Sequence, residues 1–435
     1  MNVPVFQNIT QKDQRTLTFK MSPTRVTYAN VLRRAIQTEV SVLAFRADMT
    51  ETGTTTDVKV FKNSTPMSNE MLADRIGVLP IVMPSGEGWD KEKVLFRLKV
   101  INDTDEVRYV TASDFECLEK HPDESERQRV PNTKFFHPDP VTQETCLIAV
   151  LKPMVEGQDP EEIHIEAYAS LGKGREHTRF NPTSQCAYQY SLDSDPAKIK
   201  AKFATWLQEQ KKIDPRELEK DADRKKILES EFRTLEIYRC FLEDADGEPF
   251  SFDFVIESLS TMPAQKIVYQ ALLAVAERAE KYAAVDKGDL PDNLDIRPAD
   301  ARLKGFDFWF SVEDHTLGNL LQTWLDDNKI GHRENASGVS FAGYKVPHPL
   351  RDEMLLRIGV EDGREDSARL AIAEASQATA NMFRTWAAQW LEAVEGVGLS
   401  ALGERKKPWD AHMEAKGLSS AAQAQAVEAA PRSRK

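Results

Sequence analysis

The chain has 435 residues, which is longer than one typical domain, so two or three domains are expected. Hydrophobic residues make up 41% of the chain and charged residues 29%, and no apolar run approaches the ~20 residues of a bilayer-spanning helix, so no membrane association is expected. The net charge of −13 argues against duplex DNA as a direct ligand, because phosphate binding normally needs an excess of Lys and Arg.

The cysteines and the N-terminus indicate which kinds of site and which targeting signals the sequence lacks. The four cysteines are widely separated and form no C-x-x-C pair, so the sequence predicts no zinc ribbon and no redox site. We expect no metal and no cofactor. The first fifteen residues lack the basic and apolar regions of a secretory signal, so an intracellular, non-secreted protein is expected.

The first part of the chain predicts a strand followed by an amphipathic helix. Residues 17–21 alternate between apolar and polar side chains, as a half-buried strand does. A helical stretch is expected over residues 24–45, and Thr24 or Thr27 can cap its start. Its apolar positions recur at three- and four-residue steps. They are Tyr28, Val31, Leu32, Ala35, Ile36 and Val40.

The middle of the chain changes character twice. A short helix is expected to start at Ser68 and to end at Gly77 in the left-handed conformation. Short strand patterns separated by loops rich in Asp, Pro and Gly then fill residues 87–190. Residues 195–238 are strongly charged and favour a solvated helical surface.

The last part repeats the order of strand and helix. A strand at 250–257 precedes a helix signalled by Thr261 and Pro263, whose apolar stripe includes Ile267 and Leu272. A linker, another strand, a helix at 316–327, two further strands and a long helix at 367–394 follow. The helix at 316–327 carries an apolar face made of Leu317, Leu320, Leu321 and Trp324.

Two of these helices contain similar segments. Residues 27–32 and 316–321 both read T-x-[small]-N-[aliphatic]-L, and each follows a predicted strand. Two similar half-cores can pair about a pseudo-two-fold axis and bury each other's helix stripe. Asn30 and Asn319 are unfavourable inside helices, and either local hydrogen bonding or direct contact with the other half explains them.

Six segments of the sequence, in the correct order, resemble two partner families. VTYANVLRRAIQTEV, NSTPMSNEMLADRIGVLPI, LGKGREHTRFNP and FDFVIESLSTMPAQKIVYQAL resemble the α-type subunits of DNA-directed RNA polymerases: bacterial α, archaeal D and the third-largest eukaryotic subunit. VEDHTLGNLLQTWL with VSFAGYKVPHPLRDEMLLRIGV resembles the smaller partner family, archaeal L and its eukaryotic counterpart. Such a fusion is known among large DNA viruses of eukaryotes.

The resemblance implies an α+β protein with two α-like dimerisation modules, strands packed on long helices, that pair within one chain. Residues 1–50 and 230–285 would form the first module, interrupted by a mostly β inserted domain at 51–229 with a charged helical segment at 195–229. A linker at 286–304, a second module at 305–398 and a disordered tail at 399–435 complete the expected organisation. The expected intramolecular dimerisation core is Val31, Leu32, Ile36, Ile267, Leu272, Leu317, Leu320 and Leu321.

The resemblance also implies partners and contacts. Arg33 and Arg34 match paired arginines that touch the second-largest polymerase subunit in the family. A loop of the inserted domain would face the same subunit, through Gly172, Lys173, Gly174, Glu176 and His177. The largest subunit and small zinc-ribbon-type subunits are further expected partners, with DNA met only through the complex and no homodimer. A viral source would imply the virion and host cytoplasm, or the host nucleus. The cysteine-rich metal loop of several relatives is absent from this sequence.

Other functions are open but weaker. The Gly172–His177 loop suggests an autonomous phosphate-handling enzyme, yet it lacks the third glycine of a Rossmann fingerprint and the G-K-[ST] of a P-loop. Asp244-x-Asp246-Gly247 has no third aspartate for a polymerase magnesium site and suggests a turn. No catalytic residue is therefore expected, and the predicted role is a non-catalytic scaffold on which the two large catalytic subunits assemble.

Overall fold

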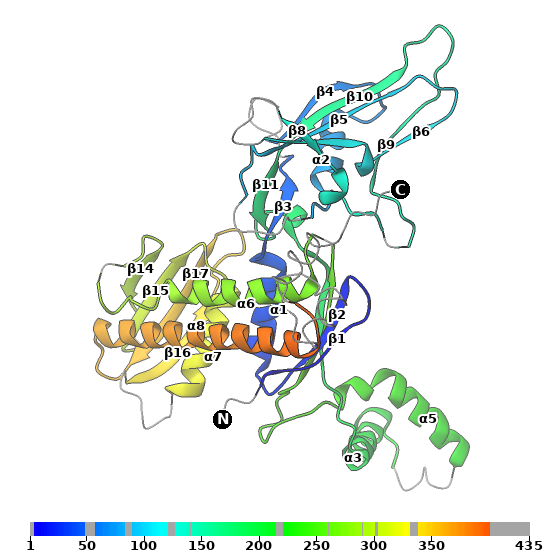
Figure 1. The fold of residues 1–435 in the computed structure, drawn as a ribbon. Helices are drawn as coiled ribbons and strands as arrows, with labels where there is room; N and C mark the ends of the chain where they lie inside the picture. Colours follow the sequence, from blue (N-terminus) through cyan, green and yellow to red (C-terminus); the bar gives the residue numbers. More distant parts are fainter. Residues whose placement is uncertain are drawn as a thin grey trace, which may run out of the picture.

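The computed structural model describes residues 4–47, 57–82, 89–120, 127–139, 141–214, 221–259, 261–288, 290–300, 303–330 and 338–400. Within these ranges the side chains form four hydrophobic cores, in two modules, an inserted domain and a helical appendage (Figure 1). The predicted α+β fold, with two paired modules and an inserted β domain, is confirmed. The described helices include none with the length and apolarity needed to cross a membrane.

The first module is a four-stranded antiparallel sheet covered by two helices. The sheet order is β1-β2-β13-β12, so strands far apart in the sequence lie side by side. The strands are β1 (Phe6–Gln11), β2 (Thr16–Met21), β12 (Thr183–Tyr190) and β13 (Phe252–Ser258). The helices are α1 (Val26–Thr38) and α6 (Ala264–Glu280). Their apolar stripes pack into one core with Phe19, Phe252 and Phe254.

The second module repeats this plan. Its sheet order, β14-β15-β17-β16, places each strand where the first module has its counterpart. In both, a hairpin precedes a helix, two further strands follow, and a long helix ends the module. The elements are β14 (Leu294–Pro298), β15 (Gly305–Ser311), α7 (His315–Asn328), β16 (Val339–Lys345), β17 (Glu353–Val360) and α8 (Glu365–Gly396). The repeat expected from residues 27–32 and 316–321 thus places α1 and α7 at equivalent positions.

The inserted domain has a five-stranded sheet, order β4-β10-β5-β7-β8, and a separate two-stranded ribbon β6-β9. The strands are β4 (Val58–Asn63), β5 (Val94–Asn102), β6 (Arg108–Thr111), β7 (Phe115–Glu119), β8 (Gln128–Val130), β9 (Leu147–Leu151) and β10 (Glu161–Ala167). Buried Phe45, Phe96, Phe115 and Phe135 form the centre of its core, together with the helix α2 (Asn69–Gly77).

A short ribbon joins the inserted domain to the first module. Residues 41–45, which were expected to continue the helix, form the strand β3 (Ser41–Phe45), because they pair with β11 (Ala169–Lys173) in antiparallel register. Because side chains alternate across a strand, Val42 and Ala44 enter the core of the first module while Leu43 and Phe45 enter the core of the inserted domain. One strand therefore belongs to two cores and fixes the direction in which the inserted domain leaves the module.

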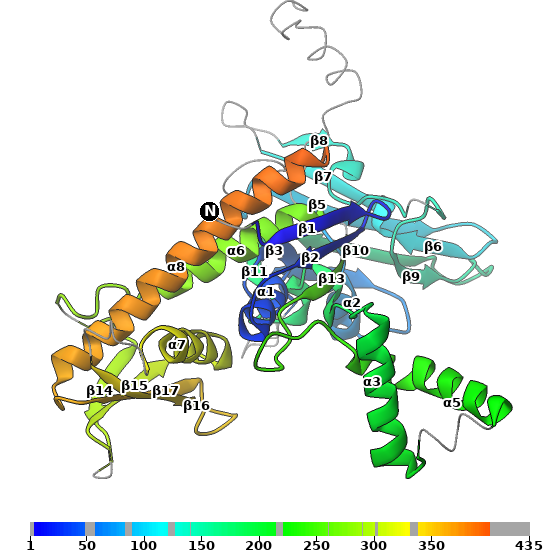
Figure 2. The same cartoon turned by 90° about the horizontal axis from the view of Figure 1, so that it is seen from below.

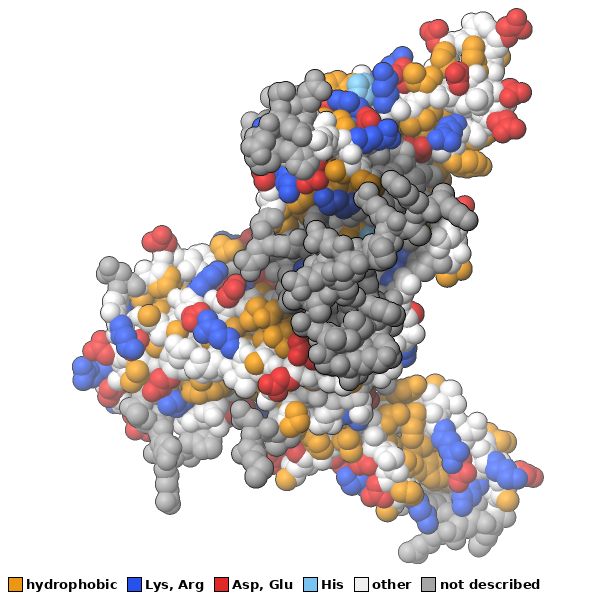
Figure 3. All heavy atoms as spheres, viewed as in Figure 1, with side chains coloured by type: hydrophobic (Ala, Val, Ile, Leu, Met, Phe, Trp, Pro, Cys, Tyr) orange, Lys and Arg blue, Asp and Glu red, His pale blue; other side chains and the backbone are white. Residues whose placement is uncertain are grey.

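The charged segment forms a separate helical appendage between β12 and β13. It consists of α3 (Pro196–Trp206), a π-helical turn at 207–211 and α5 (Ala222–Leu235). Most of this segment was expected to be a solvated helical surface; in addition, it has a small core of its own, made of Trp206, Leu207, Leu228, Phe232 and Cys240. Charged side chains cover its outer surface, and hydrophobic ones gather on the side towards the sheet (Figure 3).

Two expected domain boundaries differ from the structure. β12 lies in the sheet of the first module rather than in the inserted domain, because it pairs with β13 along its whole length. β14 lies within the expected linker, because Leu294 and Ile296 point inwards from an edge strand whose final Pro298 tolerates that position. Of the tail expected at 399–435, Leu399 packs against the core of the first module, and residues 401–435 lie outside the described residues.

Two helix ends also differ. Neither Thr24 nor Thr27 caps α1: the N-cap position is Arg25, without a side-chain cap, and the Thr27 hydroxyl is engaged elsewhere. Ser68 caps α2 as expected, accepting from the Met71 amide. Gly77 is the last helical residue and is not left-handed; a Cβ there would lie 3.1 Å from Ala47 Cβ and 3.2 Å from the Phe45 carbonyl oxygen. Close packing therefore explains this glycine.

α6 and α8 lie side by side and cross both modules (Figure 2). The first half of α8 packs in the core of the second module, whereas Phe383, Trp386 and Trp390 of its second half are buried in the core of the first. Tyr282 and Val285, which follow α6, enter the core of the second module in return. Each module therefore completes the core of the other.

Trp390 of α8 allows the packing of α8 into the core of the first module to be tested by substitution. Its ring lies 5.0 Å from Phe6 and 4.9 Å from Phe19, and its Nε1 donates to the Gln265 carbonyl oxygen at 2.9 Å. We expect Trp390→Ala to destabilise the protein by about 3–5 kcal/mol, because it leaves a cavity and removes this hydrogen bond. Thermal unfolding of the variant measures the effect. The exposed Tyr109→Ala should change stability by no more than about 0.5 kcal/mol, and an equal loss for both variants would contradict the exchange.

Candidate interface site between the two halves

α1 and α7 pack antiparallel at the interface of the modules. The hydroxyl oxygens of Thr27 and Thr323 lie 3.1 Å apart, and Arg34 Nε donates to Thr316 Oγ1 at 2.8 Å. Thr27 and Thr316 are equivalent in the internal repeat, and the same offset of 289 residues relates Arg34 to Thr323. The two contacts are therefore a pair related by the pseudo-two-fold axis, as in a symmetric dimer interface.

The middle of this interface is apolar. Val31, Ala35 and Val275 of the first module face Leu317 and Leu320 of the second around a small cavity. All eight residues expected in the dimerisation core are buried, with at most 2% of each exposed. Leu320 belongs to the core of the first module, Leu317 and Leu321 to that of the second, and the other five to the first.

The two asparagines of the repeat have different partners. Asn30 Oδ1 accepts from Nε and Nη2 of Arg33 on the same helix, at 3.1 and 2.9 Å. Asn319 Nδ2 lies 3.5 Å from Thr27 Oγ1 on the opposite helix, and its Oδ1 lies 3.5 Å from Thr323 Oγ1. Local bonding thus explains Asn30, whereas Asn319 contacts the other half.

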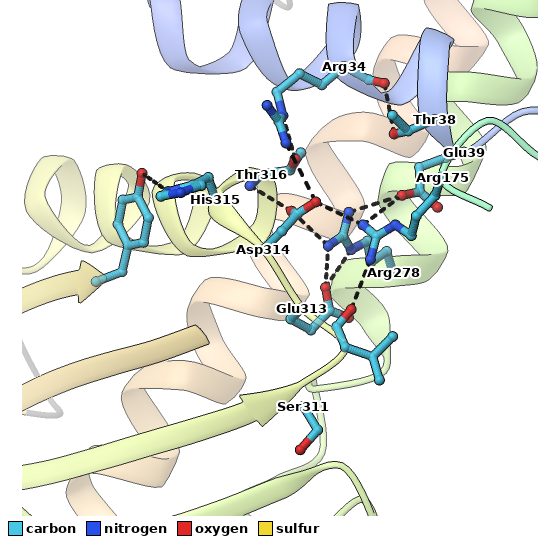
Figure 4. Close-up of polar contacts among 12 residues, drawn as sticks. Arg34, Thr38, Glu39, Arg175, Arg278, Ser311, Glu313, Asp314, His315 and Thr316 are labelled. Atoms are coloured by element: carbon cyan, nitrogen blue, oxygen red, sulfur yellow. Dashed lines mark hydrogen bonds and ion pairs between the residues drawn. The ribbon is translucent and has the colours of Figure 1, made fainter. Parts of the chain in front are cut away.

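A buried arginine holds one end of the interface. Arg278 of α6 donates from Nε to Glu313 at 2.6 Å, from Nη1 to Glu39 at 3.2 Å and from Nη2 to Asp314 at 3.0 Å (Figure 4). The side chain of Arg278 is only 10% exposed, and those of Glu39 and Glu313 are 9% and 6% exposed. The hydroxyl of Tyr282 donates to the second oxygen of Glu313 at 3.1 Å.

Arg175 links a third segment to the same carboxylates. Its Nη2 lies 2.9 Å from Glu39 Oε1 and 3.0 Å from Asp314 Oδ2, while its Nη1 donates to the Val312 carbonyl oxygen at 2.8 Å. Val312 has a φ of +65°, which is strained for a β-branched residue. This strained turn lies immediately before Glu313 and Asp314, so the chain presents both carboxylates at the start of α7.

The charges of this cluster stabilise one another. Burial alone would raise the pKa of Asp314, but Arg278, Arg175 and the amide of Thr316 outweigh it and lower the pKa to about 2. Burial opposes the charge of Arg278, yet Glu313, Asp314 and Glu39 together raise its pKa further. Burial and the neighbouring Glu313 also raise the pKa of Tyr282, so its hydroxyl stays protonated as a donor.

The paired arginines expected to face a large subunit lie differently. Arg33 donates from Nη1 to Gln37 Oε1 at 3.0 Å, besides its bonds to Asn30, and remains partly exposed beside β12. Arg34 contacts the second module through Thr316 and lies 3.5 Å from Asp314 Oδ2. The guanidinium of Arg34 thus contacts the second module, whereas that of Arg33 donates only to residues of its own helix in the described structure and lies on the outer side of α1. Contact with another subunit stays a prediction for both.

The Gly172–His177 loop packs against the end of α1. A Cβ on Gly174 would lie 1.9 Å from the Gln37 carbonyl oxygen, and one on Gly172 would lie 2.6 Å from the Phe180 ring, so both glycines permit close approach. The other loop residues pair locally. Lys173 Nζ lies 3.6 Å from Glu39, Glu176 lies 2.7 Å from Arg46, and His177 Nδ1 accepts from the Arg179 amide at 3.1 Å.

Sequence reasoning missed the residues that form the charge cluster. Arg278 falls within the apolar stripe of α6, between Val275 and Ala279, and a charged residue at such a position is the signal that could have revealed it. Asp314 is the N-cap of α7, accepting from the Thr316 amide at 2.8 Å. Glu39, Arg175 and Glu313 lie at segment ends where no periodicity applies, so the sequence contains no comparable signal for them.

Comparison with known proteins agrees with this arrangement. Residues 306–389, from β15 through most of α8, match the family model described as the RNA polymerase Rpb3/Rpb11 dimerisation domain. The second module is thus similar to this dimerisation domain. Its partner within the chain is the first module, which has the same strand order and an equivalent pair of helices.

Several curated relatives are archaeal proteins named DNA-directed RNA polymerase subunit Rpo3. Those of Methanosphaera stadtmanae and Methanothermobacter thermautotrophicus are 25% and 29% identical over 44% and 41% of this chain. These alignments span 64% and 60% of the two relatives, less than two thirds of their length. The Methanopyrus kandleri protein is 26% identical over 62% of this chain and 90% of its own length. The chain is thus similar, over part of its length, to archaeal proteins with this name.

Acid should weaken the interface through Asp314. Its folded pKa of about 2 is below the unfolded value of ~3.9, so its contribution is complete above pH ~4 and is lost as the pH falls towards 2. The side chain is 33% exposed, and after allowance for solvent screening the contribution is roughly 1–2 kcal/mol.

Asp314→Asn keeps an N-cap side chain but removes the charge. We expect the variant to be less stable than the wild type at pH 6 and to lose less stability between pH 4 and 2.5, as measured by urea unfolding. Asp105→Asn, in the exposed loop between β5 and β6, serves as the control and should follow the wild type. Parallel pH curves for the wild type and Asp314→Asn would contradict this role.

Proposed function

We propose that this chain is a non-catalytic assembly subunit of a multisubunit DNA-directed RNA polymerase, on which the two large catalytic subunits associate. The observation that carries the proposal is the pseudo-symmetric pair of modules, of which the second matches a polymerase dimerisation domain. The archaeal relatives named Rpo3 support it. Asp244 accepts from the amides of Asp246 and Glu248 and thus forms the local turn that Asp244-x-Asp246-Gly247 suggests.

In this proposal two subunits that are separate in other organisms form one polypeptide. The M. kandleri alignment covers 62% of the chain, whereas residues 306–435 amount to 130 of 435, so the relatives must also match much of the sequence before Phe306. This supports an α/D-like half joined to an L-like half. The tether between the halves gives an effective concentration of about 1 mM, which favours pairing within the chain over pairing between chains.

The proposed partners are the second-largest and largest polymerase subunits and small zinc-ribbon-type subunits. Arg33 is available for such a contact because it remains partly exposed on the outer side of α1. The Gly172–His177 loop packs against Gln37, the residue to which Arg33 donates. Arg33 and the loop can therefore contribute to one surface. DNA would be reached only through the assembled enzyme. A large DNA virus of eukaryotes is the proposed source, with assembly in the virion and host cytoplasm or in the host nucleus.

Purification of the tagged chain from its native source tests this proposal. We expect two large polymerase subunits to be recovered with it, identified by mass spectrometry. Arg33→Ala should reduce the recovery of the second-largest subunit, whereas Arg297→Ala, on β14 at the far edge of the second module, should not. Recovery of the wild-type chain without any large polymerase subunit would overturn the proposal.

The oligomeric state tests the intramolecular pairing separately. Because the interface of each module is already occupied within the chain, the isolated protein should remain a monomer of 49.2 kDa over a wide range of concentrations. Light scattering coupled to size-exclusion chromatography measures this mass. A stable dimer would show that the modules pair between chains.

A further inference from the structure

A groove lies at the other end of the α1/α7 pair, opposite the charge cluster of Arg278. The segment before α1, the last turn of α7 and the turn before β13 form its walls, and Trp386 of α8 also lines it. Tyr28 and Phe250 contribute two further aromatic rings. The hydroxyl oxygen of Thr24, which also lines the groove, is buried and has no hydrogen-bond partner in the part of the chain that the structure describes.

The pseudo-two-fold axis makes the two ends of the α1/α7 pair comparable, and their charges differ. At the first end, Arg278, Arg175 and Arg34 of this chain neutralise the carboxylates. At the second end, the lining contains Asp244, Glu248, Asp326 and Asp327 but only one cation, Arg25. Arg25 lies 2.9 Å from Asp327. Within the described ranges, Asp244, Glu248 and Asp326 form no ion pair.

The position of Asp326 is unfavourable unless a cation is nearby. It lies in the last turn of α7, where the helix dipole disfavours negative charge. Asp326 is exposed, but partial desolvation raises the pKa of its carboxyl group, and Gln322 and Arg25 oppose this shift only in part. The aromatic residues beside it bind cations through their ring faces, best when the site is partly desolvated. The groove therefore has the chemistry to bind a short segment that combines Lys or Arg with an apolar side chain.

The chain itself contains such a segment. Residues 401–435 hold seven Lys or Arg and four Asp or Glu, a net charge of +3, whereas the whole chain has a net charge of −13. Arg405, Lys406 and Lys407 are consecutive and are followed by Pro408 and Trp409. This segment thus matches both the acidic lining and the aromatic lining of the groove.

The segment is also within reach of the groove. Trp386 lies ten residues before Gly396, the last residue of α8, so about 15 Å of helix separates the two. The nine residues from 401 to 409 span up to about 30 Å when extended. The chain can therefore turn back after α8 and reach Trp386.

We propose that this groove binds the basic segment Arg405–Trp409 of the same chain, with its cationic side chains against Asp244, Glu248 and Asp326. The segment supplies to the second end of the interface the cations that Arg278 and Arg175 supply to the first. Because these pairs are exposed, binding weakens as the salt concentration rises. The contact is independent of any polymerase partner.

Zero-length cross-linking of the full chain tests the proposal. A carbodiimide joins Lys amines to carboxylates that touch them, and mass spectrometry identifies the joined peptides. We expect Lys406 or Lys407 to be linked to Asp244, Glu248 or Asp326, with a yield that falls between about 0.05 M and 0.5 M salt. An equal mixture of ¹⁴N- and ¹⁵N-labelled chains should give only products of a single isotope.

Matched variants show whether the carboxylates of the groove are responsible. Glu248→Gln with Asp326→Asn removes two of the acceptor carboxylates, so the informative product is the remaining link to Asp244, whose yield should fall about fivefold. Asp105→Asn with Glu106→Gln removes the same charge from an exposed loop of the inserted domain and should leave the yield unchanged. Links from Lys406 and Lys407 to carboxylates elsewhere would overturn the proposal. Products of mixed isotope would assign the groove to the tail of a second copy and overturn it equally.

Discussion

The buried side chain of Arg278 couples the three segments that meet at the interface of the modules. It extends from α6 to Glu39 at the end of α1 and to Glu313 and Asp314 before α7. Removing one member of a buried ion pair typically costs about 3–5 kcal/mol, because the remaining charge has neither water nor a partner. If any one of the three segments shifted, the buried charges on the others would lose a partner, at a similar cost in free energy. The apolar stripes bring the helices together, but we infer that these charges select one register among several similar ones.

The orientation of the inserted domain depends on this register through the β3–β11 ribbon. The first strand of the ribbon follows Glu39 directly, and its side chains alternate between the two cores. The loop after β11 returns to the interface, where Arg175 contacts Glu39 and Asp314. Because Ser41 pairs with Lys173, both strands of the ribbon meet the charge cluster at the same end, and the other end of the ribbon leads into the inserted domain. The ribbon and its loop pack so closely here that a side chain on Gly172 would clash with the Phe180 ring and one on Gly174 with the backbone of Gln37.

Sequence patterns predicted the elements that local chemistry determines. The stripe of α1, the cap at Ser68 and the repeat at residues 27–32 and 316–321 depend on spacing along one segment, and each is found in the structure. Pairing across long distances was not predictable in this way. β12 reads as a strand in isolation, but only its register with β13 assigns it to the first module. The charge cluster is a further example, since Glu39 and Glu313 are 274 residues apart in the sequence and have no shared pattern.

The connection between α6 and β15 has a consequence for how the interface can evolve. Partners encoded as separate chains must be attractive to each other and also unattractive to copies of themselves, which costs stability and restricts the sequence. A pair held in one polypeptide is made in a fixed ratio, and neither half is ever present without the other. Selection against self-pairing is then relaxed, and substitutions that would create orphan homodimers of a free subunit become tolerable. Asymmetric features, such as the arginines at one end of the α1/α7 pair and the carboxylates at the other, are free to acquire separate uses.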